Sequence, residues 1–265
     1  GAAGILATFL SVMAVLPLTL VVLFWNELRR LGRGIAATVA SLCAVSVLLG
    51  GARAPLLGML VGAGVLLLVG RRVRNRARRE EFVPLLAGVL LAVFALFLIA
   101  GSTPLLSRLG SLGSDISGRV RAPIWLGATQ LIVEHPVLGV GPDNFASAYA
   151  ELRGSDAPAT SSVDATGLSP HNWAMRIALD AGIVGLAAYA LILVTAASTV
   201  WRGRSATSVV GLTVLVAYIA QGLVAVDQLG LEWIPWLCLG LIASRAASLP
   251  EDALLDPMKA RPRDS

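Results

Sequence analysis

The pair His171-Asn172 is the part of this sequence best suited to chemistry. It closes a long polar segment and directly precedes an apolar run, in a chain of 265 residues with only 2 histidines. Histidine is the side chain whose unperturbed pKa lies near neutrality, so an imidazole where water meets an apolar phase is a candidate proton acceptor. The alternative interpretation is an interfacial polar residue that caps the following helix.

Three arginines form a second group with chemical potential. Arg53 stands in a short turn between two apolar runs, and Arg119 and Arg121 stand in the long polar segment. The planar guanidinium matches phosphate oxygens bidentately and stays charged at any physiological pH, so an anionic ligand would explain all three. The structural alternatives are carbonyl bonding or snorkelling at a span end for Arg53, and a solvated helix face for Arg119 and Arg121.

Composition defines the class of protein that positions these residues. Hydrophobic residues make up 56% of the chain and charged residues 14%, and the mean hydropathy is +0.79. Such long apolar runs exclude a water-soluble globule and predict an all-α, multi-span helical membrane protein. Because the arginines lie in short clusters between apolar runs, they are interpreted as orientation signals, and no nucleic-acid partner is expected. Cys43 and Cys238 lie in different runs without metal-ligand spacing, which predicts neither a disulfide nor a metal site.

The apolar runs predict about seven transmembrane helices. The chain begins inside the first run, as the C-terminal part of a longer protein would, and we expect residues 1–265 to form a single membrane domain. The second and third runs are short and closely spaced, so one re-entrant hairpin is an alternative for that pair. The predicted spans are 2–25, 35–50, 55–70, 82–100, 173–200, 209–226 and 233–249.

The basic clusters predict how these spans are oriented. With seven crossings, all of the clusters between and after the spans fall on one side, which the positive-inside rule makes cytoplasmic. The segment 101–172 then becomes one long extracytoplasmic loop at the plasma membrane, and Arg53, Arg119, Arg121 and His171 share the outer side. The clusters are Arg29, Arg30 and Arg33; the run 71–79; Arg202 and Arg204; and Lys259, Arg261 and Arg263.

The outer loop has predicted structure of its own. Helical spacing of apolar residues predicts a helix over 117–134, in which Pro123 is tolerable in the first turn or so, and His135-Pro136 ends it. A glycine turn over 139–142 follows, and Pro142 is expected to begin a short helix that runs to about Leu152. The segment 154–167 is polar and aperiodic, and we expect it to be a mobile cover.

Two further polar motifs are interpreted as structural. Arg176 and Asp180 are spaced four residues apart inside the fifth predicted span, which favours an intramembrane ion pair that holds this helix against its neighbours. His135 stands beside a proline at a helix end, and we interpret it as an element that ends the helix.

The sequence resembles the O-antigen ligase and polymerase family of bacterial membrane proteins, whose shared region is the O-antigen ligase-related domain. Three motifs within about 35–200 carry the resemblance: GARAPLLG at 51–58; RAPIW at 121–125 with EHPVLGVGPDNF at 134–145; and His171-Asn172 followed at fixed spacing by Gly182 and Gly185. Two features depart from the family pattern. Ala52 stands where the family usually has Ser or Thr, and members usually carry several more spans ahead of this region.

The resemblance implies a glycosyltransferase that moves a glycan from a polyprenyl diphosphate to an acceptor hydroxyl, with inversion and without a metal or other cofactor. His171 would be the base, Arg53 and Arg121 would stabilise the leaving diphosphate, and Arg119 and Asn172 would bind substrate. The partners would be the lipid-linked donor, a glycan or glycolipid acceptor and membrane lipid. The sugar, the acceptor, and the choice between ligation and polymerisation stay open.

Three rival classes remain at this stage. A transporter or flippase for an anionic lipid-linked substrate would also use outer arginines, but it favours charged or broken helices near mid-membrane. A membrane-bound acyltransferase would use one histidine and one asparagine without needing outward arginines. A purely structural membrane subunit would need none of these residues.

Overall fold

The computed structural model describes residues 2–50, 53–73, 116–153, 169–203, 205–223 and 231–246. Within these ranges, the side chains of 2–5, 53, 71–72, 116–122, 153 and 245–246 are not described. The described residues form eight α-helices and no strand. This confirms the all-helical class. The helices are α1 (Ala2–Leu23), α2 (Arg30–Gly50), α3 (Arg53–Val73), α6 (Ile116–Glu134), α7 (Phe145–Arg153), α8 (Trp173–Gly203), α9 (Ala206–Gly222) and α10 (Trp233–Ala246).

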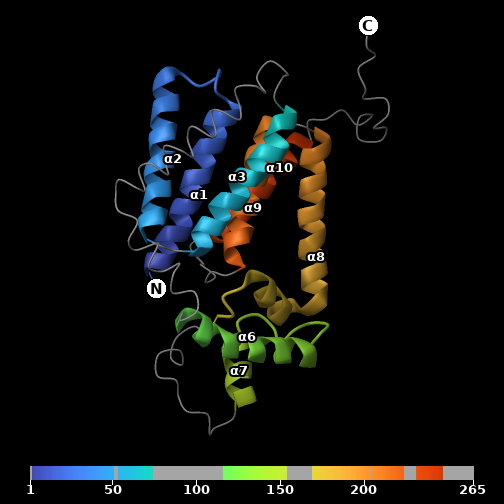
Figure 1. Ribbon diagram of the computed structural model, residues 1–265. Helices are drawn as coiled ribbons and strands as arrows, with labels where there is room; N and C mark the ends of the chain where they lie inside the picture. Colours follow the sequence, from blue (N-terminus) through green and yellow to red (C-terminus); the bar gives the residue numbers. More distant parts are fainter. Residues whose placement is uncertain are drawn as a thin grey trace.

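Six of these helices are apolar and form a bundle, from which α6 and α7 project at one end (Figure 1). By length and composition α1, α2 and α8 can each cross a membrane, while α3, α9 and α10 contain shorter apolar stretches. Six of the seven predicted spans therefore correspond to helices. The remaining predicted span, 82–100, and the predicted cover, 154–167, lie outside the described residues. Helix α2 begins five residues before the predicted Ile35, and α9 ends four residues before the predicted Val226.

The centre of the bundle is a contact of α3 and α9 with α1 and α10. Its core holds Val12 of α1, Val214 and Leu215 of α9, and Ile242 of α10, each at most 4% exposed. Gly58 and Gly62 of α3 face Ala217, so closely that a Cβ atom at Gly58 would lie 2.7 Å from the Ala217 carbonyl oxygen. Without a hydrophobic drive between helices in lipid, small residues at such spacing allow the close packing that holds two spans together.

The two ends of the bundle differ in character (Figure 1). The connection from α1 to α2 lies at the end opposite to α6 and α7, and it carries basic residues. Arg33 donates from Nε to the Leu28 carbonyl oxygen at 2.9 Å, and its guanidinium lies 4.7 Å from the Trp25 ring centroid. The beginnings of α3 and α8 lie at the end that carries α6 and α7.

Candidate functional site

The segment before the main part of α8 organises the site. The helix begins at Trp173 but breaks at Gly182, where φ is 63° and ψ is −156°. A short helix over 173–181 therefore precedes a long one over 183–203. The predicted span from Trp173 to Val200 lies within α8, and the structure adds a kink at Gly182, because a residue in this conformation cannot continue a regular α-helix.

Asn172 begins the short helix as its N-cap. Its Oδ1 accepts hydrogen bonds from the backbone N–H groups of Ala174, at 2.9 Å, and Met175, at 3.1 Å. These are two of the donors that the first turn of a helix leaves without an intrahelical partner. The capping alternative weighed for the His-Asn pair therefore holds for Asn172.

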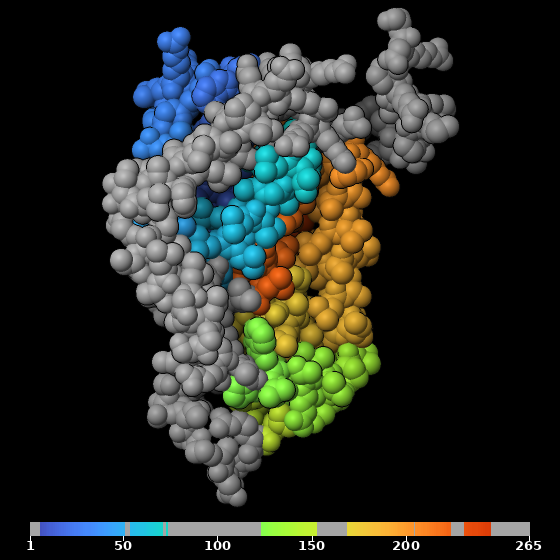
Figure 2. All heavy atoms as spheres, viewed as in Figure 1, coloured from blue at the N-terminus to red at the C-terminus, as the bar shows by residue number. Residues whose placement is uncertain are grey.

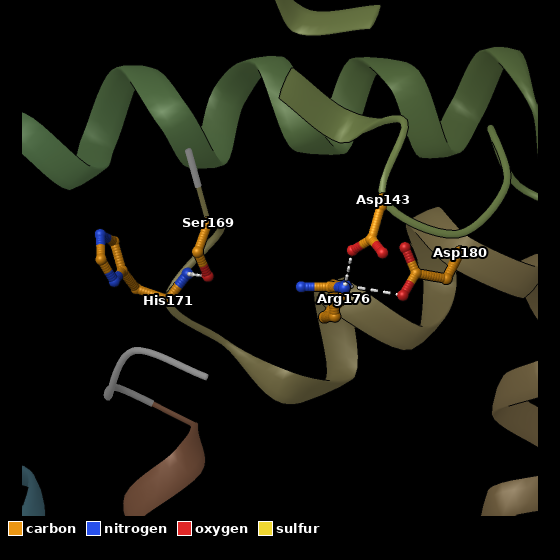
Figure 3. A network of polar contacts seen from close by, with 5 residues as sticks. All are labelled: Asp143, Ser169, His171, Arg176 and Asp180. Carbon is orange, nitrogen blue, oxygen red and sulfur yellow. Dashed lines mark hydrogen bonds and ion pairs between the residues drawn. The ribbon is translucent and has the colours of Figure 1, made fainter. Parts of the chain in front are cut away.

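His171 precedes this cap in a left-handed backbone conformation, with φ of 51°. Non-glycine residues adopt this conformation only occasionally, and histidine is among the residue types that tolerate it best. The hydroxyl of the buried Ser169 accepts a hydrogen bond from the His171 backbone N–H at 3.2 Å. Figure 3 shows that the half-buried imidazole points away from Arg176 and its two carboxylate partners. His171 and the ion pairs therefore occupy opposite sides of the segment.

Trp125 connects α6 to the residue directly before His171. Its indole Nε1–H donates to the Pro170 carbonyl oxygen at 2.7 Å. Arg121 lies four residues earlier in α6, one turn away and on the same face of the helix. The Trp125 bond therefore anchors α6 beside the residue that precedes His171, and Arg121 lies in the helical turn before Trp125. Arg119 belongs to the same helix, about half a turn before Arg121.

A second series of contacts links the beginning of α3, through the end of α9, to the beginning of α8. Gly58, five residues after Arg53, packs against Gln221 near the end of α9. The neighbouring Gly222 packs against the Trp173 ring, whose Nε1–H donates to the Ile219 carbonyl oxygen at 3.0 Å. The end of α9 therefore lies between the first turns of α3 and the beginning of α8. The backbones that carry Arg53, Arg121 and His171 therefore all lie at the end of the bundle that carries α6 and α7 (Figure 1).

The turn after α6 fits into the break of α8 through two glycines. The Ile183 N–H donates to the Pro136 carbonyl oxygen at 2.9 Å, and the Val140 N–H donates to the Leu179 carbonyl oxygen at 2.6 Å. A Cβ atom at Gly182 would lie 2.1 Å from the Val137 carbonyl oxygen, and one at Gly139 would lie 2.2 Å from that of Leu179. Each glycine lets the opposite backbone approach.

These contacts give physical meaning to two of the sequence motifs. Gly182 packs against the backbone of the loop turn at Val137 and Leu138 and not against a neighbouring span. The nearest atom to a Cβ at Gly185 would be the Ala181 Cβ, at 2.5 Å, so Gly185 accommodates the bend of its own helix. Both glycines therefore serve the break of α8.

Arg176 joins the short helix to the loop by two ion pairs (Figure 3). Its Nε lies 2.6 Å from Asp180 Oδ2, and its Nη2 lies 2.6 Å from Asp143 Oδ1. The predicted pair with Asp180 is confirmed, but it precedes the break of α8 and holds the loop rather than a neighbouring span. Asp143 was not expected to take part. Its positive φ of 58° also explains why α7 begins at Phe145 and not at Pro142.

The loop has a small core of its own. Ile124, Ala128 and Leu131 of α6 pack against Phe145 and Tyr149 of α7, and Leu179 of the short helix closes the cluster. The predicted helix over 117–134 is confirmed to within one residue and ends before His135-Pro136 as expected. Pro123 lies in its eighth position, deeper than the predicted first turn. Figure 2 shows the loop helices, in green, directly below the N-terminal end of α8.

Within the ranges that the structure describes, no three His, Cys, Asp or Glu side chains gather as ligands of a metal ion. Cys43 and Cys238 are free thiols, in different helices. Among the described residues, Arg176, Asp143 and Asp180 are charged groups that the loop contact brings together.

The fold and the site define a helical membrane protein with a structured loop docked on one end of its bundle. A family model described as O-antigen ligase matches residues 37–190, more than half of the chain. The chain belongs to this family, which acts on lipid-linked glycans in polysaccharide biosynthesis. No curated protein and no solved structure was found to match.

Proposed function

We propose that this protein transfers a glycan from a polyprenyl diphosphate to an acceptor hydroxyl at the outer face of the plasma membrane. The observation that supports the proposal is that the backbones of the three candidate residues lie at the same end of the bundle. Trp125 bonds to Pro170 beside His171, and Gly222 packs on Trp173 two residues after it. A base and two phosphate-binding arginines would thus be gathered from segments far apart in the sequence.

The proposed reaction is a direct displacement at the anomeric carbon. His171 takes the proton as the acceptor O–H bond breaks and the acceptor oxygen forms the new glycosidic C–O bond. The C–O bond to the diphosphate breaks, and the diphosphate leaves with the electron pair. Attack from the face opposite to the leaving group inverts the anomeric configuration.

Arg53 and Arg121 are assigned to the leaving group. Negative charge grows on the diphosphate in the transition state, and fixed guanidinium donors stabilise it without any further proton transfer. Arg119 would assist on the same helix as Arg121. Asn172 uses Oδ1 as a helix cap, so its Nδ2 donors are the part of that side chain proposed to bind a sugar hydroxyl.

The predicted topology completes the proposal. Seven spans, including 82–100, would place residues 101–172 outside as one loop of a single membrane domain. The donor diphosphate at the outer membrane surface would then meet both the loop and the beginning of α3. We assign the basic connection between α1 and α2 to the cytoplasmic side.

One feature of the structure bears on the transporter alternative. Transporters build substrate sites at broken helices, and α8 is broken at Gly182. At this break, however, the Ile183 and Val184 N–H groups donate to carbonyl oxygens of the loop, so the freed groups serve to dock protein on protein. This arrangement favours the transferase.

The deciding experiment uses the purified protein in detergent micelles, where there is no membrane to cross. Incubation with a lipid-linked glycan and an acceptor should form a glycosidic product and release polyprenyl diphosphate. Activity should survive a strong chelator such as EDTA. Loss of activity in EDTA that Mg²⁺ or Mn²⁺ restores would overturn the role of the arginines. Binding of the lipid-linked glycan without any transfer would favour the transporter.

Glycan analysis of a deletion strain separates the two transferase types. Accumulation of full-length lipid-linked chains would indicate that a ligase had been lost. Accumulation of single repeat units would indicate that a polymerase had been lost.

A further inference from the structure

The loop carries an exposed apolar patch that neither its own core nor the proposed reaction explains. We define the loop patch as Val133 at the end of α6 together with Val137 and Leu138 in the turn after it. These side chains are 72%, 57% and 70% exposed. The opposite face of α6 is already filled, because Ile124 and Leu131 are buried against α7 and the short helix. The side chains of the loop patch are therefore not part of the core of the loop.

The loop patch is continuous with an outward-facing surface of α8. The Ile183 N–H bonds to the Pro136 carbonyl oxygen, and the Val184 N–H lies 3.5 Å from that of Val137. Ile183 and Val184 are themselves 59% and 54% exposed. The same helix continues through the exposed Leu191 and Val194, along a stretch long and apolar enough to cross a membrane.

We infer that the loop patch is a membrane-contact surface, seated in the headgroup and upper acyl region of the same leaflet in which α8 begins its span. Exposed apolar surface that continues the lipid face of a span is stabilised by lipid for the same reason as the span itself. The exposed Glu134 and His135 beside it are polar and fit the headgroup layer. The inference rests on membrane insertion alone and does not depend on the proposed transferase activity.

This contact would fix the depth of the candidate site relative to the membrane surface. The turn that carries Val137 and Leu138 is bonded to the break of α8, and α6 is bonded to Pro170 beside His171. Seating the loop patch in the leaflet would therefore hold His171 at the membrane surface, where the headgroup of any lipid-linked molecule lies.

The test measures the depth of a fluorophore on the full chain. Leu138→Cys is labelled with an environment-sensitive dye in a Cys43→Ala, Cys238→Ala background and reconstituted into phosphatidylcholine and phosphatidylglycerol vesicles. A nitroxide near the headgroup should quench the dye severalfold more than a nitroxide at the chain end, and iodide in the water should quench it weakly. Ala150→Cys, on an exposed position of α7, is the matched control. Its dye should be quenched strongly by iodide and weakly by either nitroxide.

Two results would overturn the inference. Strong iodide quenching at Leu138 without lipid quenching would place the loop patch in water. Protection from both quenchers would instead indicate a protein partner or a second copy. Val133→Cys repeats the measurement independently if the Leu138 variant folds poorly, and retention of a sharp size-exclusion peak checks folding in each case.

Discussion

The bundle and the docked loop are held together by different kinds of contact. In the bundle, α3, α9 and α1 pack through apolar side chains and close glycine contacts, as at Gly58 and Gly62. The loop packs its apolar core on Leu179 and adds directional bonds: backbone to backbone at the break of α8, indole to carbonyl at Trp125, and guanidinium to carboxylate at Arg176. Apolar packing tolerates small shifts, whereas hydrogen bonds fix distance and angle. The region with directional contacts is the one that positions His171.

The largest expected effect on the transfer rate comes from substituting His171, which removes the proposed base while leaving both regions folded. His171→Ala should lower transfer by roughly 10²- to 10⁴-fold, the usual contribution of a positioned proton acceptor. His171→Asn is the sharper variant, because asparagine tolerates the left-handed backbone at this position and so separates loss of the base from backbone strain. Both should be measured as initial rates in micelles.

His135→Ala is the matched control, because His135 lies in the exposed turn after α6. It should affect expression more than turnover. Normal rates in a well-expressed His171→Asn protein would remove the imidazole from the mechanism.

The next largest effect is expected from a substitution that disrupts the contact between the loop and the break of α8. Gly182→Ala places a Cβ against the Val137 carbonyl oxygen in a conformation that alanine disfavours. We expect a destabilisation of about 1–3 kcal/mol from this overpacking. Displacement of the loop should lower transfer by about 10²-fold, the cost of misplacing a catalytic group by roughly 1 Å. Gly64→Ala, where a Cβ would meet nothing within 4 Å inside α3, is the control and should leave transfer unchanged without lowering stability.

The third effect tests whether the two regions act on one ligand. Arg53→Lys changes the end of the bundle, and Arg121→Lys changes the loop; each keeps the charge but loses the bidentate fork. We expect each to lower kcat/KM by roughly 10- to 100-fold, the equivalent of about 1.5–3 kcal/mol for a charged hydrogen bond. If both bind one diphosphate, the double variant should lose less than the product of the two single losses. Strict multiplication would assign the two arginines to separate sites.

The smallest effects are expected on stability, from substitutions of Asp143 and Asp180, the two ion-pair partners of Arg176. The Asp143 side chain is 87% exposed and that of Asp180 is 21% exposed. Because solvent screens the exposed pair, Asp143→Asn should cost about 0.2–1 kcal/mol of stability. Asp180→Asn should cost more, since it leaves the guanidinium with its more exposed partner. Thermal unfolding in detergent measures both, and a larger loss at Asp143 would contradict this ranking.

Much of the secondary structure could be predicted from local sequence patterns. Apolar runs of span length predicted six helices of the bundle, because in lipid a helix must satisfy its own backbone polar groups. Proline and glycine marked the end of α6 at His135-Pro136 and the turn that follows. The predictions were less accurate where a boundary depends on a residue's φ, as at Asp143, or on a long-range contact, as at Gly182.

The sequence by itself determined the helical class, the alternation of basic and apolar segments, the family and the identity of the candidate residues, because each of these is written in composition or in short-range spacing. Only the tertiary structure decided what those spacings accomplish. The break of α8 is stable because the loop backbone satisfies its freed N–H groups, and Asp143 becomes a partner of Arg176 only when that loop docks. Contacts between segments more than thirty residues apart follow from three-dimensional packing, which no local pattern encodes.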